Sequence, residues 1–122
     1  MKTLLYSLLL AAAAAAPAAE SPSLTGSWKV HSSIGGYEND LECAFTQTDR
    51  QLAGSCKGEQ GSLAITGEVA DKKVTFQYKT QYNGEDLTVV HTGTLESAAK
   101  IVGTVDAQPM GVAGEFTAIQ AK

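Results

Sequence analysis

The sequence is poor in several features that mark common protein classes. Its 122 residues include only three prolines, two cysteines, two histidines and one tryptophan. The formal charge is −4, and no run of Lys or Arg is present, which argues against nucleic acid or an anionic membrane surface as a partner. Two cysteines and two distant histidines are too few ligands for a zinc site. We therefore expect no metal, no cofactor and no nucleic-acid partner.

The first residues have the pattern of an export signal. Lys2 precedes an apolar run from Leu4 to Ala16, and Ala16-Pro17-Ala18 fits the small-x-small rule for cleavage. We expect residues 1–18 to be removed as a signal peptide, and residues 19–122 to form a single domain in the periplasm or outside the cell. No later apolar run is long enough for a transmembrane helix, so we expect no transmembrane segment in the mature chain.

Export makes a disulfide the expected state of Cys43 and Cys56. From Leu41 to Lys57 apolar and polar residues alternate, and Asp49-Arg50 supplies a tight turn. A hairpin centred on this turn places Cys43 directly opposite Cys56, at a non-hydrogen-bonded pair. Because Cα atoms approach most closely at such pairs, a cross-strand disulfide can form there with little movement.

The rest of the chain also reads as short strands. Alternation continues through further turns at Asp71-Lys72 and Asn83-Gly84, and no helical period appears. An apolar-x-Gly pattern recurs irregularly, which suits close packing of inward glycines inside a small barrel. We predict an all-β fold, an eight-stranded antiparallel up-and-down barrel, because closure removes both exposed edges. A two-sheet β-sandwich is the alternative.

The segment Leu24-Thr25-Gly26-Ser27-Trp28, at the start of the first expected strand, resembles the Gly-x-Trp opening of calycins. These include lipocalins, fatty-acid-binding proteins and avidins. The resemblance implies that Trp28 is a structural plug across the closed end of the barrel. Avidins place several tryptophans around biotin, whereas this chain has one, so the resemblance does not extend to biotin binding.

The same opening, a single disulfide and export also resemble the bacterial inhibitors of serralysin-type metalloproteases. In that family a flexible N-terminal tail enters the protease cleft. The corresponding tail here is the short segment from Ala19 to Ser23. This resemblance implies an extracellular hydrolase as the partner.

Up-and-down topology sorts the connections between strands to two ends. Residues 49–50, 71–72 and 97–100 are expected at the end near Trp28, and residues 32–39, 57–61, 82–85 and 107–111 at the other. The second set is longer on average and could form an apolar mouth. Our candidate ligand-binding residues are Ile34, Tyr37, Tyr78, Tyr82, His91 and Met110. The alternative is that they pack over a core filled by side chains.

Both histidines fall on expected strands. His91 faces inward, where burial favours its neutral form. It could orient a polar ligand group or act as a base, or it could be a core residue hydrogen-bonded to Tyr78, Thr80 or a trapped water. His31 faces outward and is expected to be solvated, as is the strip of Glu38, Asp40 and Glu42 on the same hairpin.

No catalytic motif is present, and we expect no enzymatic activity. The leading interpretation is an exported binding protein that holds a small, mostly apolar ligand in the mouth of the barrel. The alternatives are an inhibitor of a metalloprotease or other hydrolase, and an envelope interaction module without a pocket.

Overall fold

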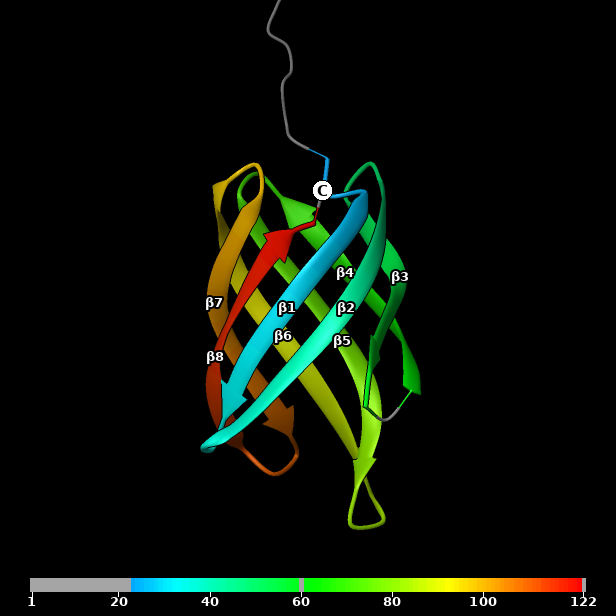
Figure 1. Cartoon of the computed structure of the whole chain (residues 1–122), viewed down its shortest axis with the longest axis vertical. Coiled ribbons are helices and arrows are strands. Elements are labelled where there is room, and N and C mark those ends of the chain that lie inside the picture. Colours follow the sequence, from blue (N-terminus) through cyan, green and yellow to red (C-terminus); the bar gives the residue numbers. More distant parts are fainter. Residues whose placement is uncertain (1–22, 60, 122) are drawn as a thin grey trace, which may run out of the picture.

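The computed structural model describes residues 23–59 and 61–121, which form one closed β-barrel (Figure 1). Its strands are β1 (Gly26–Ile34), β2 (Tyr37–Thr48), β3 (Gln51–Gly58), β4 (Gly61–Ala70), β5 (Lys73–Tyr82), β6 (Glu85–Ser97), β7 (Lys100–Gln108) and β8 (Val112–Gln120). Each strand pairs antiparallel with its neighbour in sequence, and β1 also pairs with β8. The up-and-down barrel is confirmed, and the sandwich alternative is wrong.

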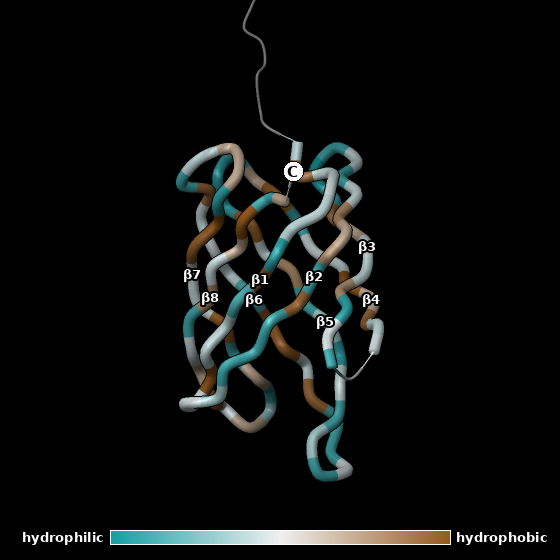
Figure 2. The backbone as a smooth tube through the Cα atoms, in the orientation of Figure 1, coloured by the Kyte–Doolittle hydropathy of each residue, from teal (hydrophilic) through white to brown (hydrophobic). Residues whose placement is uncertain are grey.

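The two-residue alternation places one face of every strand inside. Figure 2 shows the resulting change between hydrophilic and hydrophobic residues along the chain. In β6 the buried positions are Leu87, Val89, His91, Gly93 and Leu95. No bulge in the earlier strands reverses this parity, and the register shift between Leu95 and Ser97 comes only at the end of β6.

The cysteine hairpin has the register predicted from its turn. Cys43 pairs with Cys56, their Cα atoms are 3.9 Å apart, and the disulfide is formed. Both cysteines are almost completely buried. The bridge therefore ties β2 to β3 from inside the barrel. A disulfide is compatible with the oxidising compartment expected for an exported chain.

The connections at the end away from Trp28 are shorter than the sequence suggested. The expected segment 32–39 is strand on both sides of a two-residue turn at Gly35 and Gly36, and Asn83-Gly84 likewise forms a two-residue turn. All four turn residues have positive φ, between 53° and 85°, as the tightest hairpin turns require. Because these residues let the strands extend almost to their tips, the connections at this end are only slightly longer on average than those at the Trp28 end.

Large rings lie opposite glycines on neighbouring strands. Phe45 pairs with Gly26 of β1 and Gly54 of β3, while Phe116 pairs with Gly103 of β7. A Cβ atom added at Gly103 would overlap the backbone carbonyl of Thr92. The inward glycines therefore let the strands coil tightly, and the phenyl rings fill the space that the missing side chains leave.

Aromatic side chains fill the closed half of the barrel. Trp28 contacts Phe45, Phe45 contacts Phe76, and Phe76 contacts Phe116, with ring centroids 6.1, 5.2 and 5.8 Å apart. The indole Nε1 of Trp28 donates a hydrogen bond of 2.9 Å to the carbonyl of Leu24, and both residues are buried. This end, where β1 begins, is at the top of Figure 1.

Candidate ligand-binding site

The other half of the barrel is hollow. A cavity of about 440 Å³ opens between the turns that lie at the bottom of Figure 1. This volume falls within the range of small-molecule pockets. Seven of the described lining residues are aliphatic: Ile34, Leu41, Leu63, Leu87, Val89, Ala107 and Val112. The barrel is thus filled at one end and open at the other.

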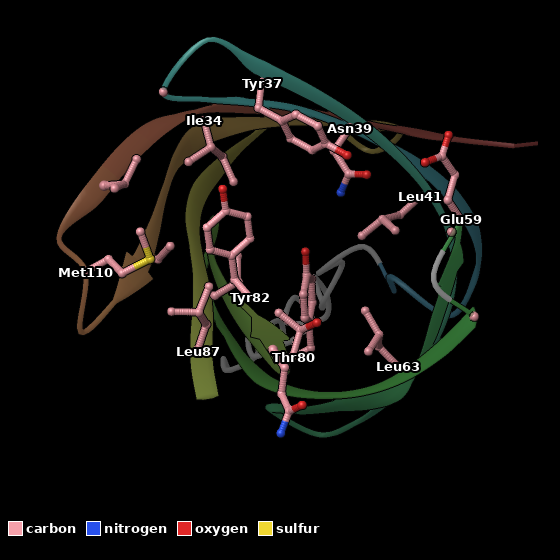
Figure 3. A pocket seen from close by; sticks show the side chains of 18 residues that line it. Ile34, Tyr37, Asn39, Leu41, Glu59, Leu63, Thr80, Tyr82, Leu87 and Met110 are labelled. Carbon is pink, nitrogen blue, oxygen red and sulfur yellow. The ribbon is translucent and has the colours of Figure 1, made fainter. Parts of the chain in front are cut away.

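Tyrosines occupy three positions around this cavity. Tyr37 and Tyr82 lie at the opening and are 61% and 57% exposed, whereas Tyr78 is buried deeper in the wall. In Figure 3 the rings of Tyr37 and Tyr82 flank the opening, with Met110 beside them at its edge. Exposed large apolar side chains around a cavity are typical of a binding site.

A few polar groups interrupt the apolar wall. Asn39 is half-buried beside Tyr37, Thr80 is half-buried on β5, and Glu59 is exposed at the edge of the opening (Figure 3). None of the described residues that line the cavity is a lysine, arginine or histidine. Burial also raises the pKa of the Tyr78 phenol, because the charged phenolate would lose its hydration there. The inner wall therefore disfavours negative charge.

Five of the six candidate residues line the cavity. Ile34, Tyr37, Tyr78, Tyr82 and Met110 come from β1, β2, β5 and the turn between β7 and β8, and the barrel brings them together. The aliphatic wall positions Leu41, Leu63 and Leu87 were missed as site residues. Their inward parity was predictable, and what the sequence did not show is that no side chain fills the space between them.

His91 does not line the cavity. Its imidazole is completely buried deeper in the barrel than the cavity. It is stacked on Phe76, with ring centroids 4.3 Å apart, and lies edge-on to Phe116, with ring centroids 4.9 Å apart. The expected hydrogen bond to Tyr78 or Thr80 is not formed, and among the described residues neither ring nitrogen has a hydrogen-bond partner. The reason is that aromatic rings, rather than polar groups, surround the imidazole: Phe76 and Tyr78 from β5 and Phe116 from β8.

Burial lowers the pKa of His91 to about 4. The dominant cause is the loss of hydration of the charged form, and a weak interaction with the backbone of Phe76, which does not meet hydrogen-bond geometry, opposes the shift. His91 is therefore a neutral core residue at neutral pH, and its contact with the ring of Tyr78, 5.8 Å between centroids, is its link to the cavity wall.

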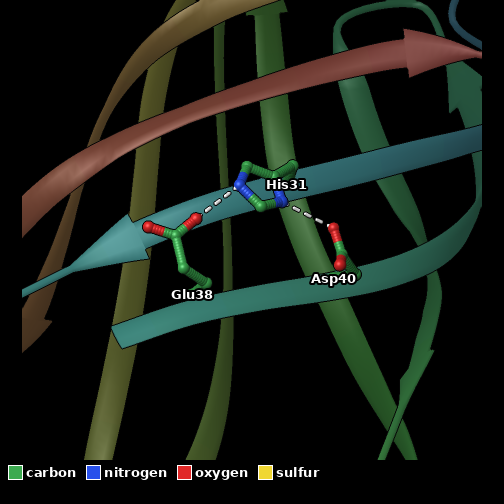
Figure 4. A network of polar contacts seen from close by, with 3 residues as sticks. All are labelled: His31, Glu38 and Asp40. Carbon is green, nitrogen blue, oxygen red and sulfur yellow. Dashed lines mark hydrogen bonds and ion pairs between the residues drawn. The ribbon is translucent and has the colours of Figure 1, made fainter. Parts of the chain in front are cut away.

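The outward histidine is exposed, as expected, and it lies between two carboxylates that are hydrogen-bonded to it (Figure 4). The Nδ1 atom of His31 lies 2.6 Å from Asp40, and its Nε2 atom lies 2.7 Å from Glu38. His31 and Asp40 are paired across β1 and β2, and Glu38 is two residues away on the same face of β2. The hydrogen bonds to Asp40 and then Glu38 raise the pKa of His31.

Part of what the sequence predicts concerns residues that the structure does not describe. The expected signal peptide and residues 19–22 of the expected inhibitory tail lie outside the described residues. Within residues 23–59 and 61–121, no group of three or more His, Cys, Asp or Glu side chains is placed to hold a metal ion. The same part of the chain contains no helix with the length and hydrophobicity to cross a membrane.

Comparisons with known proteins show the fold and no family. No family model matches the chain, and no curated protein matches it. Three solved structures of redesigned β-barrels are similar to it. One has 15% sequence identity and a TM-score of 0.66, covering 81% of this chain and 92% of its own. The others, mFAP0 and mFAP1, are both bound to DFHBI. They have 18% and 15% identity and TM-scores of 0.58 and 0.56. Each covers 80% of this chain, which in turn covers 98% of mFAP0 and 94% of mFAP1.

Proposed function

We propose that this chain is an exported carrier or scavenger that binds a small, mostly apolar molecule in the open half of its barrel. The observation that carries the proposal is the cavity of about 440 Å³, with its aliphatic wall and exposed rim of Tyr37, Tyr82 and Met110. A barrel filled by side chains at this end would not account for the exposure of Tyr37, Tyr82 and Met110. The cavity also favours ligand binding over an interaction module without a pocket.

The likeness to designed barrels supports the proposal in a limited way. Two of them hold DFHBI, so a barrel of this architecture can accommodate a small molecule. The calycin resemblance of Leu24 to Trp28 leads to the same ligand class. Of the candidate residues, we assign Ile34, Tyr37, Tyr78, Tyr82 and Met110 to direct contact with the ligand, and His91 to the packing beneath Tyr78.

The test uses a neutral fluorescent probe, N-phenyl-1-naphthylamine, which becomes bright in apolar surroundings. Ala107 is buried and lines the cavity, so Ala107→Trp places an indole in the binding space. Ala113 is exposed on the outer face of the adjacent strand β8, which makes Ala113→Trp the matched control. We expect the wild type and the control to bind the probe, and Ala107→Trp to bind at least about tenfold more weakly, a change of roughly 1.4 kcal/mol.

Absence of probe binding by the wild type, or equal binding by both variants, would contradict the cavity as the binding site. Export is tested separately by the intact mass of protein expressed with its own N-terminus. We expect cleavage after Ala18 and the loss of two hydrogens through the bridge between Cys43 and Cys56. An uncleaved chain would contradict the export part of the proposal.

A further inference from the structure

We propose that the cavity prefers apolar ligands that carry an ammonium group over ligands of the same shape that carry a carboxylate. The apolar part would lie inside the barrel and the ammonium group at the opening, near Tyr37, Tyr82 and Glu59. This inference rests on the proposed function and adds the charge of the ligand to it.

The charged groups that line the cavity favour a cation over an anion. Glu59 is the one charged side chain among the described lining residues, and its carboxylate lies at the edge of the opening, as Figure 3 shows. A carboxylate ligand would find no lysine, arginine or histidine among those residues to neutralise it. An ammonium group at the same place would have an opposite charge nearby.

Further acidic residues lie around the opening. Glu85 and Asp86 begin β6 directly after the turn at that end, and Glu38 and Asp40 lie near the tip of the β1–β2 hairpin. His31 lies between the last two and offsets part of their charge when it is protonated. The ammonium groups of Lys57, the second-last residue of β3, and of Lys79, three residues before the end of β5, offset part of the remaining charge. The balance at the mouth stays negative, which attracts cations and repels anions at low ionic strength.

The aromatic side chains at the rim also favour a cation. Tyr37 and Tyr82 are both more than half exposed, and Figure 3 shows their rings at the opening. The negative face of an aromatic ring attracts an ammonium ion, and pairs of such rings form cages for cationic head groups. The same faces give a carboxylate no comparable stabilisation.

The inner wall explains why the charged group should stay at the opening. Tyr78 is buried among Leu63, Leu87 and Val89, and any ion drawn to that depth would lose its hydration. An apolar tail loses nothing there and gains from leaving water. The site is therefore suited to an amphiphile whose tail points toward Tyr78 and whose head remains hydrated.

The experiment compares three competitors of the same tail length: decylamine, decanol and decanoate. Each displaces N-phenyl-1-naphthylamine from the full mature protein at pH 7, below its aggregation concentration and at low ionic strength. We expect decylamine to bind roughly tenfold more tightly than decanoate, with decanol between them, because several weak charge interactions add at the rim. High salt should shrink the difference between the two charged competitors.

Charge-reversed variants place the effect at the opening. Glu59→Lys should lower the preference for decylamine several-fold, whereas Glu68→Lys should leave it nearly unchanged, since Glu68 lies outside the barrel toward the Trp28 end. Probe binding with equal affinity for decylamine and decanoate, or tighter binding of decanoate, would overturn this inference and leave the proposed function standing. Failure of the neutral probe to bind at all would overturn both.

Discussion

Replacing His91 by leucine should stabilise the barrel, and the gain should grow as the pH falls. The imidazole is fully buried and has no hydrogen-bond partner among the described residues. Leaving a polar group in that state costs about 1–3 kcal/mol. The substitution also removes the stacking on Phe76 and the edge contact with Phe116, which together contribute about 1 kcal/mol. The balance predicts a gain of about 1 kcal/mol at neutral pH.

Acid adds a second contribution of definite sign. The pKa of His91 is about 4 in the folded state and 6.5 for the free side chain, so between these values the unfolded chain binds a proton that the folded chain does not. Stability is thus lost as the pH falls through this range, at up to 1.36 kcal/mol per pH unit, and the total reaches about 3 kcal/mol. His91→Leu abolishes this loss, so its advantage should rise to about 4 kcal/mol at pH 4.

Urea unfolding from pH 7 to pH 4, followed by the fluorescence of the single buried Trp28, measures both effects. His31→Gln serves for comparison: it removes the other histidine without touching the core, and below pH 6.5 it should lower the stability while the carboxylates are ionised, the opposite sign to His91→Leu. A His91→Leu protein that unfolds with the same pH dependence as the wild type would refute the reasoning. So would a loss of stability at neutral pH, which would mean that the imidazole makes a favourable polar interaction.

Three further predictions concern residues of the barrel that do not line the cavity. Because its pKa is raised by Asp40 and Glu38, His31 should titrate above 6.5 in an NMR pH titration, and Asp40→Asn should lower that value. The interaction of His31 with Asp40 and Glu38 stabilises the fold below pH 6.5 while the carboxylates are ionised, and this stabilisation is lost as the pH rises through the raised pKa. A stability difference between His31→Gln and the wild type that persists at high pH would contradict this prediction. Gly103→Ala should destabilise the barrel by about 1–3 kcal/mol in urea unfolding, since its methyl group would overlap the backbone of Thr92, whereas Thr104→Ala on the outer face should change little. Removing the bridge by Cys43→Ala and Cys56→Ala together should cost about 3 kcal/mol, the chain-entropy value for a loop of 13 residues' separation, and an unchanged urea midpoint would refute it.

Much of the fold followed from local sequence rules. The pairing of Cys43 with Cys56 was predictable because a two-residue turn at Asp49-Arg50 sets the register of the whole hairpin. The same parity placed Phe76 and His91 inside, since no bulge intervened before Leu95. Eight such strands with short links leave closure as the arrangement that pairs every edge.

The candidate site depended on interactions between distant residues. Alternation shows that Tyr78, Leu63 and Val89 face inward, and it does not show whether side chains from other strands meet across the barrel at that level. They meet at the level of Phe45 and Phe76 and leave a cavity toward the other end of the barrel, because cavity volume depends on ring sizes and directions from strands far apart in sequence. The same reason separates the two histidines. Sequence parity set which face each one occupies, whereas only the tertiary structure decided that His31 lies between two carboxylates and His91 among aromatic rings.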